Sequence, residues 1–179
     1  MSKDIKITDL VEKVQSYFPA ADSELIRKAY DFSAKVHQGQ KRLSGEPYLI
    51  HPMAVAGIIA DLKLDVPSVV AGLLHDTVED TLTSLDELRD LFGREIAVLD
   101  DGVTKLGRAN FSSREEKQAE NFRKMLLAMA KDIRVILVKL GDRLHNMRTL
   151  EYLPEHKQQR IAQETMDIYA PLANRLGIH

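Results

Sequence analysis

The apolar residues of this chain recur every three or four positions along most of its length, which is the spacing of one face of an α-helix. One such set is Leu25, Ala29, Phe32 and Val36. Asp22 or Ser23 stands just before this set and can accept a hydrogen bond from the free N–H groups of a first helical turn. The pattern therefore predicts a helix from there to about Gln38.

Proline and serine mark further helix starts. Pro52 follows His51 and Pro67 precedes Ser68, each at the beginning of an apolar segment, where a helix tolerates the missing N–H of proline. We expect the second of these helices to run to about Val78. Two Ser-x-x-Glu pairs resemble capping boxes, namely Ser84 with Glu87 and Ser113 with Glu116.

The segment 135–138 (VILV) is ambiguous, because its β-branched residues favour a strand. Its continuation to Leu150 has helical spacing, and no second strand is evident to pair with it, so we expect one buried helix. A last helix is expected from about Pro154 toward Ala173, with Pro171 kinking or ending it. Together these segments predict an all-α helical bundle.

Length and composition exclude several kinds of protein. The 179 residues suit a single compact domain, with residues 1–21 as a helical extension. A net charge of −2 gives no electrostatic footprint for direct nucleic-acid binding. The absence of cysteine excludes disulfides, thiolate metal sites and cysteine nucleophiles. The absence of cysteine also fits a cytoplasmic setting, which we expect for this protein. The first residues do not resemble a signal peptide, and no apolar run approaches the roughly 20 residues of a membrane span, so we expect no membrane partner.

A group of polar residues stands where helical packing favours apolar ones. His75 and Asp76 come directly after an apolar run, and Glu79 and Asp80 follow one turn later. On a continuous helix, His75 would lie beside Glu79 and Asp76 beside Asp80, all facing one cavity. Buried charges of this kind are unfavourable unless they are paired or bind a metal.

His51 and Asp142 complete a candidate metal site. The four candidate ligands are His51, His75, Asp76 and Asp142. Two imidazoles and two carboxylates suit Mn²⁺, Fe²⁺ or Zn²⁺ and leave coordination positions for water and substrate. Each residue alone has an ordinary interpretation: His51 could cap a helix, and Asp142 could pair with Lys139 or Arg143.

The ordered combination H…HD…D resembles the HD phosphohydrolase superfamily, which binds a divalent metal in an all-helical domain. The flanking segments resemble the hydrolase domain of the RelA/SpoT homologues. They are 37–40 (HQGQ), 44–48 (SGEPY), 50–52 (IHP), 72–81 (GLLHDTVEDT), 101–106 (DGVTKL), 138–150 (VKLGDRLHNMRTL) and 169–177 (YAPLANRLG). The resemblance covers nearly the whole chain from about residue 22.

The resemblance implies a role for each site residue. In that family the four candidate ligands bind Mn²⁺, and the Glu-Asp pair, here Glu79 and Asp80, is linked to hydrolysis. Glu79 would orient or deprotonate the attacking water or assist the leaving group. Asp80 would share that work through hydrogen bonds, or is simply an exposed acid near a helix end. His37 and His145 are expected to serve structure or to support the ligands rather than bind the metal.

The substrate residues follow from the same resemblance. Arg42 resembles the family arginine that stacks on the guanine base. Lys41 would meet phosphates or remain solvated. The residues that resemble the lining of the nucleoside pocket are Ser44, Asn146 and Thr149. Where family members often carry a lysine, this chain has Leu43, which removes one cation from the loop.

The expected function is hydrolysis of the 3′-pyrophosphate of (p)ppGpp, giving GDP or GTP plus pyrophosphate, in stringent-response alarmone turnover. The alternatives are an HD-type phosphohydrolase acting on another nucleotide and an inactive regulatory HD domain. The first is disfavoured by the loop containing Arg42, and the second by the presence of all metal and Glu-Asp residues. The segment 171–177 resembles the point where long members of the family continue, and the resemblance therefore implies a fragment of a bifunctional enzyme, with C-terminal synthetase and regulatory domains in the full-length chain.

Overall fold

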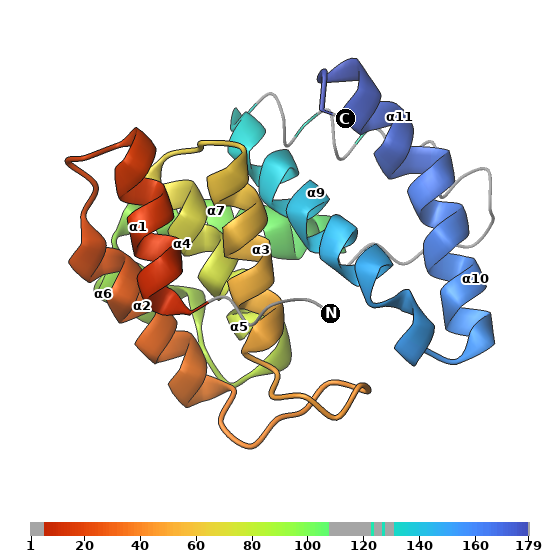
Figure 1. Cartoon of the computed structure of the whole chain (residues 1–179), viewed down its shortest axis with the longest axis horizontal. Helices are drawn as coiled ribbons and strands as arrows, with labels where there is room; N and C mark the ends of the chain where they lie inside the picture. Colours follow the sequence, from red (N-terminus) through yellow and green to blue (C-terminus); the bar gives the residue numbers. More distant parts are fainter. Residues whose placement is uncertain (1–5, 108–122, 124–126, 128–130, 179) are drawn as a thin grey trace.

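The computed structural model describes residues 6–107, 123, 127 and 131–178 (Figure 1). Helices make up most of this part, and it contains no β-strand, only an isolated antiparallel bridge between Lys41 and Pro47. The all-α prediction is therefore confirmed. Within the same residues, no helix is both long and apolar enough to cross a membrane.

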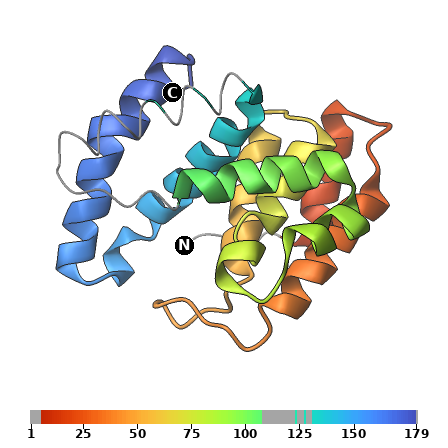
Figure 2. The same cartoon turned by 180° about the vertical axis from the view of Figure 1, so that it is seen from behind.

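The helices fall into a larger and a smaller group. The larger group contains α1 (Ile7–Tyr17), α2 (Ser23–Val36), α3 (Ile50–Asp61), α4 (Val66–Leu74), α5 (Thr77–Asp80), α6 (Leu85–Phe92), α7 (Arg94–Gly107) and α9 (Ile133–Arg148). The smaller group contains the 3-10 turn η1 (Leu150–Tyr152), α10 (Glu155–Glu164), the π-helical turn η2 (Thr165–Tyr169) and α11 (Ala170–Arg175). Helix α10 continues into α11 as one long arm beside α9 (Figure 1), and α7 lies across α4 and α9 on the opposite face (Figure 2).

Helices α3, α4 and α9 form the centre of the larger group, and two glycines let them approach closely. A Cβ at Gly72 of α4 would lie 3.1 Å from the Cα of Ala56 in α3, and one at Gly141 of α9 would lie 3.2 Å from Cδ1 of Ile59 in α3. Both distances are shorter than ordinary van der Waals contact. Because these two positions carry no side chain, the three helices pack closely. The start of α3, the end of α4 and the middle of α9 then lie next to one another.

Several helix boundaries agree with the sequence. Asp22 accepts a hydrogen bond from the backbone N–H of Leu25 at 3.0 Å, and Ser84 accepts one from Glu87 at 3.1 Å, so both predicted caps are confirmed. The pair Ser113 and Glu116 lies outside the described residues.

The ambiguous segment at 135–138 is helical, as expected. Val135, Ile136 and Val138 are buried in the apolar core of the bundle. Burial on a helix face thus outweighs their β propensity.

The helix predicted to run through Val78 is interrupted, which corrects the expectation. α4 ends at Leu74, His75 and Asp76 form a turn, and α5 begins at Thr77. His75 Nδ1 lies 2.9 Å from the carbonyl oxygen of Gly72, and the Thr77 hydroxyl donates to that of Leu74 at 2.8 Å. These side chains occupy carbonyls that a continuous helix would pair with backbone N–H groups, and they end α4 at the HD motif.

The C-terminal arm continues past Pro171 to Arg175 instead of ending there. Pro171 has no N–H for the carbonyl four residues back, and the chain widens into the π turn η2 directly before it. The arm packs on α9 through a small cluster, Ile136, Ile168, Tyr169 and Leu172. The guanidinium of Arg143 lies 4.2 Å from the centre of the Tyr169 ring, which adds a cation–π contact.

Candidate metal centre and pocket

Three of the four predicted ligands converge on one point. His51 lies in the first turn of α3, His75 in the turn after α4, and Asp142 in the middle of α9; all are buried. Their ligand atoms lie within 4.8 Å of one another. His51 Nε2 is 3.2 Å from His75 Nε2 and 3.3 Å from Asp142 Oδ1.

The hydrogen bonds around His75 show that this donor set fits a cation. The carbonyl of Gly72 can only accept, so His75 Nδ1 carries a hydrogen, and Nε2 is the ring nitrogen left to present a lone pair to a metal. That lone pair points at His51 Nε2 and Asp142, an arrangement that an intervening cation stabilises. The histidine and aspartate side chains are therefore positioned for a divalent metal.

Asp76, the fourth predicted ligand, lies at the side of this group. Its Oδ2 is 3.9 Å from His75 Nε2 and its Oδ1 is 3.3 Å from His37 Nε2. Although the side chain is buried, neither oxygen has a well-aligned hydrogen-bond partner among the described residues. Burial would raise the pKa of Asp76, but His75, His37 and His51 together lower it below its usual range, so the group is a carboxylate.

His37 and Tyr48 form a supporting layer behind Asp76 and Asp80. His37 Nδ1 lies 2.8 Å from Gln40 Oε1, and the His37 ring stacks on Tyr48 with centroids 4.6 Å apart. The Tyr48 hydroxyl donates to Asp80 Oδ2 at 2.6 Å. Burial lowers the pKa of His37, but the contacts with Asp76 and Gln40 raise it above its usual value. His37 is thus placed beside Asp76 rather than among the converging atoms of His51, His75 and Asp142.

Asp142 is held by two side chains of its own helix. Lys139 Nζ lies 2.7 Å from Oδ2, and Asn146 Nδ2 donates to Oδ1 at 2.6 Å. Burial would raise the pKa of Asp142, yet the nearby Lys139 ammonium lowers it well below its usual range. Of the two ion-pair partners expected for Asp142, Lys139 takes that position, whereas Arg143 pairs with Glu164 at 2.8 Å.

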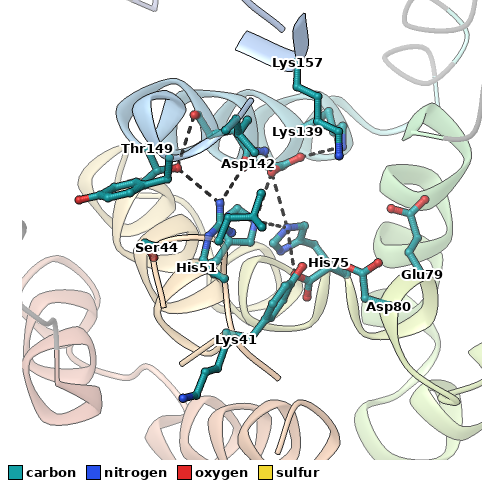
Figure 3. A pocket seen from close by; sticks show the side chains of 17 residues that line it. Lys41, Ser44, His51, His75, Glu79, Asp80, Lys139, Asp142, Thr149 and Lys157 are labelled. Atoms are coloured by element: carbon teal, nitrogen blue, oxygen red, sulfur yellow. Dashed lines mark hydrogen bonds and ion pairs between the residues drawn. The ribbon is translucent and has the colours of Figure 1, made fainter. Parts of the chain in front are cut away.

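A pocket of about 540 Å³ opens above the converging ligands. Figure 3 shows Glu79 and Asp80 on one side and Thr149 on the opposite side, with His51, His75 and Asp142 between them. Glu79 and Asp80 thus line the same pocket as His75 and Asp76, as expected. They reach it from the separate helix α5 and not from a continuation of α4.

The substrate residues expected from the resemblance all line this pocket. Arg42 Nη2 donates to Asn146 Oδ1 at 3.2 Å and to Thr149 Oγ1 at 3.4 Å, which joins the 39–48 loop to α9. Ser44 donates to Glu46 at 3.0 Å. Lys41 is exposed, and its side chain extends away from the metal ligands (Figure 3).

Three further pocket residues were not anticipated from the sequence: Tyr152, Leu153 and Lys157. They come from η1 and the start of α10, where the C-terminal arm folds back over the site. Nothing in their local pattern distinguishes them from ordinary surface residues. Tyr48 lies in the segment 44–48, but its local sequence does not indicate a role.

A family model and several known proteins match this chain. The model of the HD domain family matches residues 29–179. A Myxococcus xanthus protein named GTP pyrophosphokinase is 67% identical over 92% of this chain and 22% of its own length. A Synechocystis protein named probable guanosine-3′,5′-bis(diphosphate) 3′-pyrophosphohydrolase is 62% identical over 86% of this chain and 20% of its own length.

Two more similarities are a third sequence match and a solved structure. The Escherichia coli protein named bifunctional (p)ppGpp synthase/hydrolase SpoT is 52% identical over 95% of this chain and 24% of its own length. This chain thus spans about a fifth to a quarter of these curated relatives. A solved structure described as a metazoan ortholog of SpoT that hydrolyzes ppGpp has a TM-score of 0.62 and 25% identity, covering 79% of this chain and 82% of that one.

Proposed function

This chain belongs to the HD domain family, with RelA/SpoT-type proteins among its relatives, and from that premise we propose that it hydrolyses the 3′-pyrophosphate of (p)ppGpp. Water attacks the pyrophosphate at the 3′ ester, and the products are GDP or GTP plus intact pyrophosphate. The observation that carries the proposal is the convergence of His51, His75 and Asp142 in one pocket with Arg42 and Asn146.

We propose Mn²⁺ as the metal, held by His51, His75 and Asp142 with Asp76 as the fourth ligand. The nitrogen and oxygen donors of this site are compatible with Mn²⁺. The two buried oxygens of Asp76 lack a hydrogen-bond partner among the described residues, which supports Asp76 as the fourth ligand. When bound, such an ion lowers the pKa of water and polarises a phosphoryl oxygen.

The protein's own groups would divide the remaining work. Glu79 lines the pocket beside the HD turn, where it can orient the attacking water or take its proton. Asp80 is held by Tyr48, and its backbone carbonyl accepts from Gln40 at 3.1 Å, so it is fixed to support Glu79.

Recognition of the substrate would use the opposite wall. The planar guanidinium of Arg42, tied to Asn146 and Thr149, is suited to stacking on a guanine base, and Ser44 lies beside it. Lys139 brings a positive charge to the pocket, because the pKa-lowering effect of burial is outweighed by Asp142, which raises the pKa. Lys41 can meet phosphates at the exposed rim.

The curated relatives are several times longer than this chain, which supports its being part of a longer protein. We propose that the chain acts in the cytoplasm in stringent-response alarmone turnover, within a longer protein that also carries synthetase and regulatory domains.

Product analysis tests the proposal directly. The purified chain is incubated with ppGpp and Mn²⁺, with and without a chelator, and the products are separated by chromatography. GDP plus pyrophosphate, lost on chelation, supports the proposal. Orthophosphate alone, turnover of another nucleotide with ppGpp untouched, or no turnover with metal bound overturns it; the last two outcomes correspond to a different phosphohydrolase and to an inert regulatory domain.

A variant pair tests the role of Glu79. We expect Glu79→Gln to lower kcat by roughly 10²–10⁴-fold, the usual contribution of a general base, with Mn²⁺ affinity retained. Glu12→Gln, an exposed change on α1, is the matched control and should keep full activity. Full activity in Glu79→Gln would remove this residue from the reaction.

A further inference from the structure

His145 is a buried histidine that touches the metal centre from behind. It lies on α9 one turn after Asp142, and its Nδ1 is 2.8 Å from Nδ1 of His51, with ring centroids 4.9 Å apart. It is not among the converging ligand atoms. Its contact is with the far side of the His51 ring.

A hydrogen bond between two ring nitrogens needs one N–H and one lone pair. If His51 is neutral and its Nε2 lone pair faces His75 and Asp142, its hydrogen must be on Nδ1, and His145 Nδ1 must accept it. The reverse arrangement places the hydrogen on His51 Nε2, between the ligand atoms, where it blocks metal binding.

The two ligand imidazoles differ in how their hydrogen is placed. The partner of His75 is the carbonyl of Gly72, which can only accept and so permits one tautomer. The partner of His51 is another imidazole, which can accept or donate. The state of His51 therefore depends on the state of His145.

In the tautomer of His145 that carries its hydrogen on Nε2, Nδ1 offers a lone pair that faces Nδ1 of His51.

We propose that His145 is a positioning residue, which accepts the Nδ1–H of His51 and thereby keeps His51 Nε2 free to bind the metal. The inference rests on the metal site of the proposed function but does not depend on the substrate. It concerns the tautomer and affinity of the site, both of which can be measured without ppGpp.

The first test measures the tautomer. In the metal-free chain with ¹⁵N-labelled histidine, NMR should show the His51 hydrogen on Nδ1 and a lone pair on Nε2. A hydrogen on Nε2 in the wild-type chain would overturn the proposal, whatever the activity of the enzyme.

The second test separates accepting a hydrogen bond from filling space. Mn²⁺ affinity is measured by the EPR signal of free Mn²⁺ for His145→Leu, which cannot accept, and His145→Asn, whose amide oxygen can. We expect a roughly 10–100-fold loss for His145→Leu, in the range found for outer-shell partners, and recovery to within a few-fold for His145→Asn. His156→Leu, on the exposed face of α10, is the control and should bind as the wild type does.

The outcomes distinguish this inference from the proposed function. Wild-type affinity in a folded His145→Leu, or equal losses in both variants, would overturn the positioning role even if ppGpp is hydrolysed. If His145→Leu does not fold, as judged by circular dichroism, the tautomer measurement and the affinity of His145→Asn decide. Failure to hydrolyse ppGpp, with the expected tautomer and Mn²⁺ affinities, would overturn the substrate assignment alone.

Discussion

Two buried aspartates lie on different helices of the bundle and are accommodated in opposite ways. Asp142 on α9 has the Lys139 ammonium and the Asn146 amide within 2.7 Å, so its carboxylate stays ionised. Asp100 on α7 is fully buried, and neither of its oxygens has a hydrogen-bond partner among the described residues. Burial, with Asp76 and Glu79 nearby, raises the pKa of Asp100 well above its usual value.

The comparison shows that burial alone does not identify a functional carboxylate. A countercharge and a directed donor favour the ionised form of Asp142 and hold it toward the other candidate ligand atoms, whereas burial without a described partner raises the pKa of Asp100. Its neighbour one turn on, Thr104, is also buried and lacks a hydrogen-bond partner within the described part. We therefore expect the buried polar groups of α7 to lower stability, in contrast to the paired Asp142.

The largest expected effect comes from removing the countercharge of Asp142. Lys139→Met should destabilise the metal-free chain by about 3 kcal/mol, because it leaves a buried carboxylate without its cation. Saturating Mn²⁺ should recover part of that loss, since the ion replaces the missing charge. Urea unfolding with and without Mn²⁺ measures both.

The control for that change is the exposed pair on α7. Lys105 and Asp101 form an ion pair at 2.5 Å, but the Lys105 side chain is 74% exposed, so Lys105→Met should change stability by under about 1 kcal/mol. Equal effects of Lys139→Met and Lys105→Met would contradict the distinction between buried and exposed pairs.

The second prediction concerns Asp100. Folding raises the pKa of this carboxyl. The chain therefore keeps its full free energy of unfolding below the pKa that the carboxyl has in the unfolded chain. Part of that free energy is lost as the pH rises toward the pKa in the folded chain. Asp100→Asn removes this dependence. We expect the variant to match the wild type near pH 4 and to exceed its free energy of unfolding by about 1–3 kcal/mol at pH 8.

Denaturant unfolding at several pH values makes the measurement, with Asp101→Asn as the neighbouring control. If Asp100→Asn is no more stable than the wild type at pH 8, the carboxyl is ionised and paired, and the contrast with Asp142 fails.

The third prediction extends the comparison to a carboxylate that reaches solvent. Tyr48→Phe removes the donor to Asp80, so kcat for ppGpp should fall by up to about tenfold, the value of one hydrogen bond, with Mn²⁺ affinity unchanged. Tyr17→Phe is a matched control, because the Tyr17 hydroxyl donates to the Leu64 carbonyl at 2.8 Å away from the pocket. It should affect stability but not rate, and a similar fall in kcat for both variants would show that the effect is not local.

The smallest effect is expected at the exposed rim. Leu43 lines the pocket and is 67% exposed, so Leu43→Lys adds a well-solvated charge. We expect KM to fall by less than about fivefold, and the gain to vanish as salt is raised. Leu62→Lys, outside the pocket, should leave KM unchanged. A gain that persists at high salt would indicate a direct, desolvated phosphate contact.

The sequence predicted much of the local structure, because helix formation is decided largely by residues within a few positions of one another. The spacing around Ala29, the cap at Asp22 and the helical reading of 135–138 are confirmed. The burial of His75 and Asp76, predicted from the apolar run before them, is also confirmed, whereas their role as metal ligands stays a prediction. The continuous helix through the HD motif was wrong, because side-chain hydrogen bonds of His75 and Thr77 end α4.

The tertiary structure alone decided how these residues meet. Close packing of α3 against α4 and α9 brings His51 next to His75 and Asp142. These residues are far apart in the sequence, so no local pattern could predict that they lie together. The same packing sets His145 against His51, buries Asp100 without a partner, and places Lys157 over the pocket. The sequence thus determined which chemical groups were available and on which helices, whereas their hydrogen bonds and ionisation depended on contacts between segments far apart in the chain.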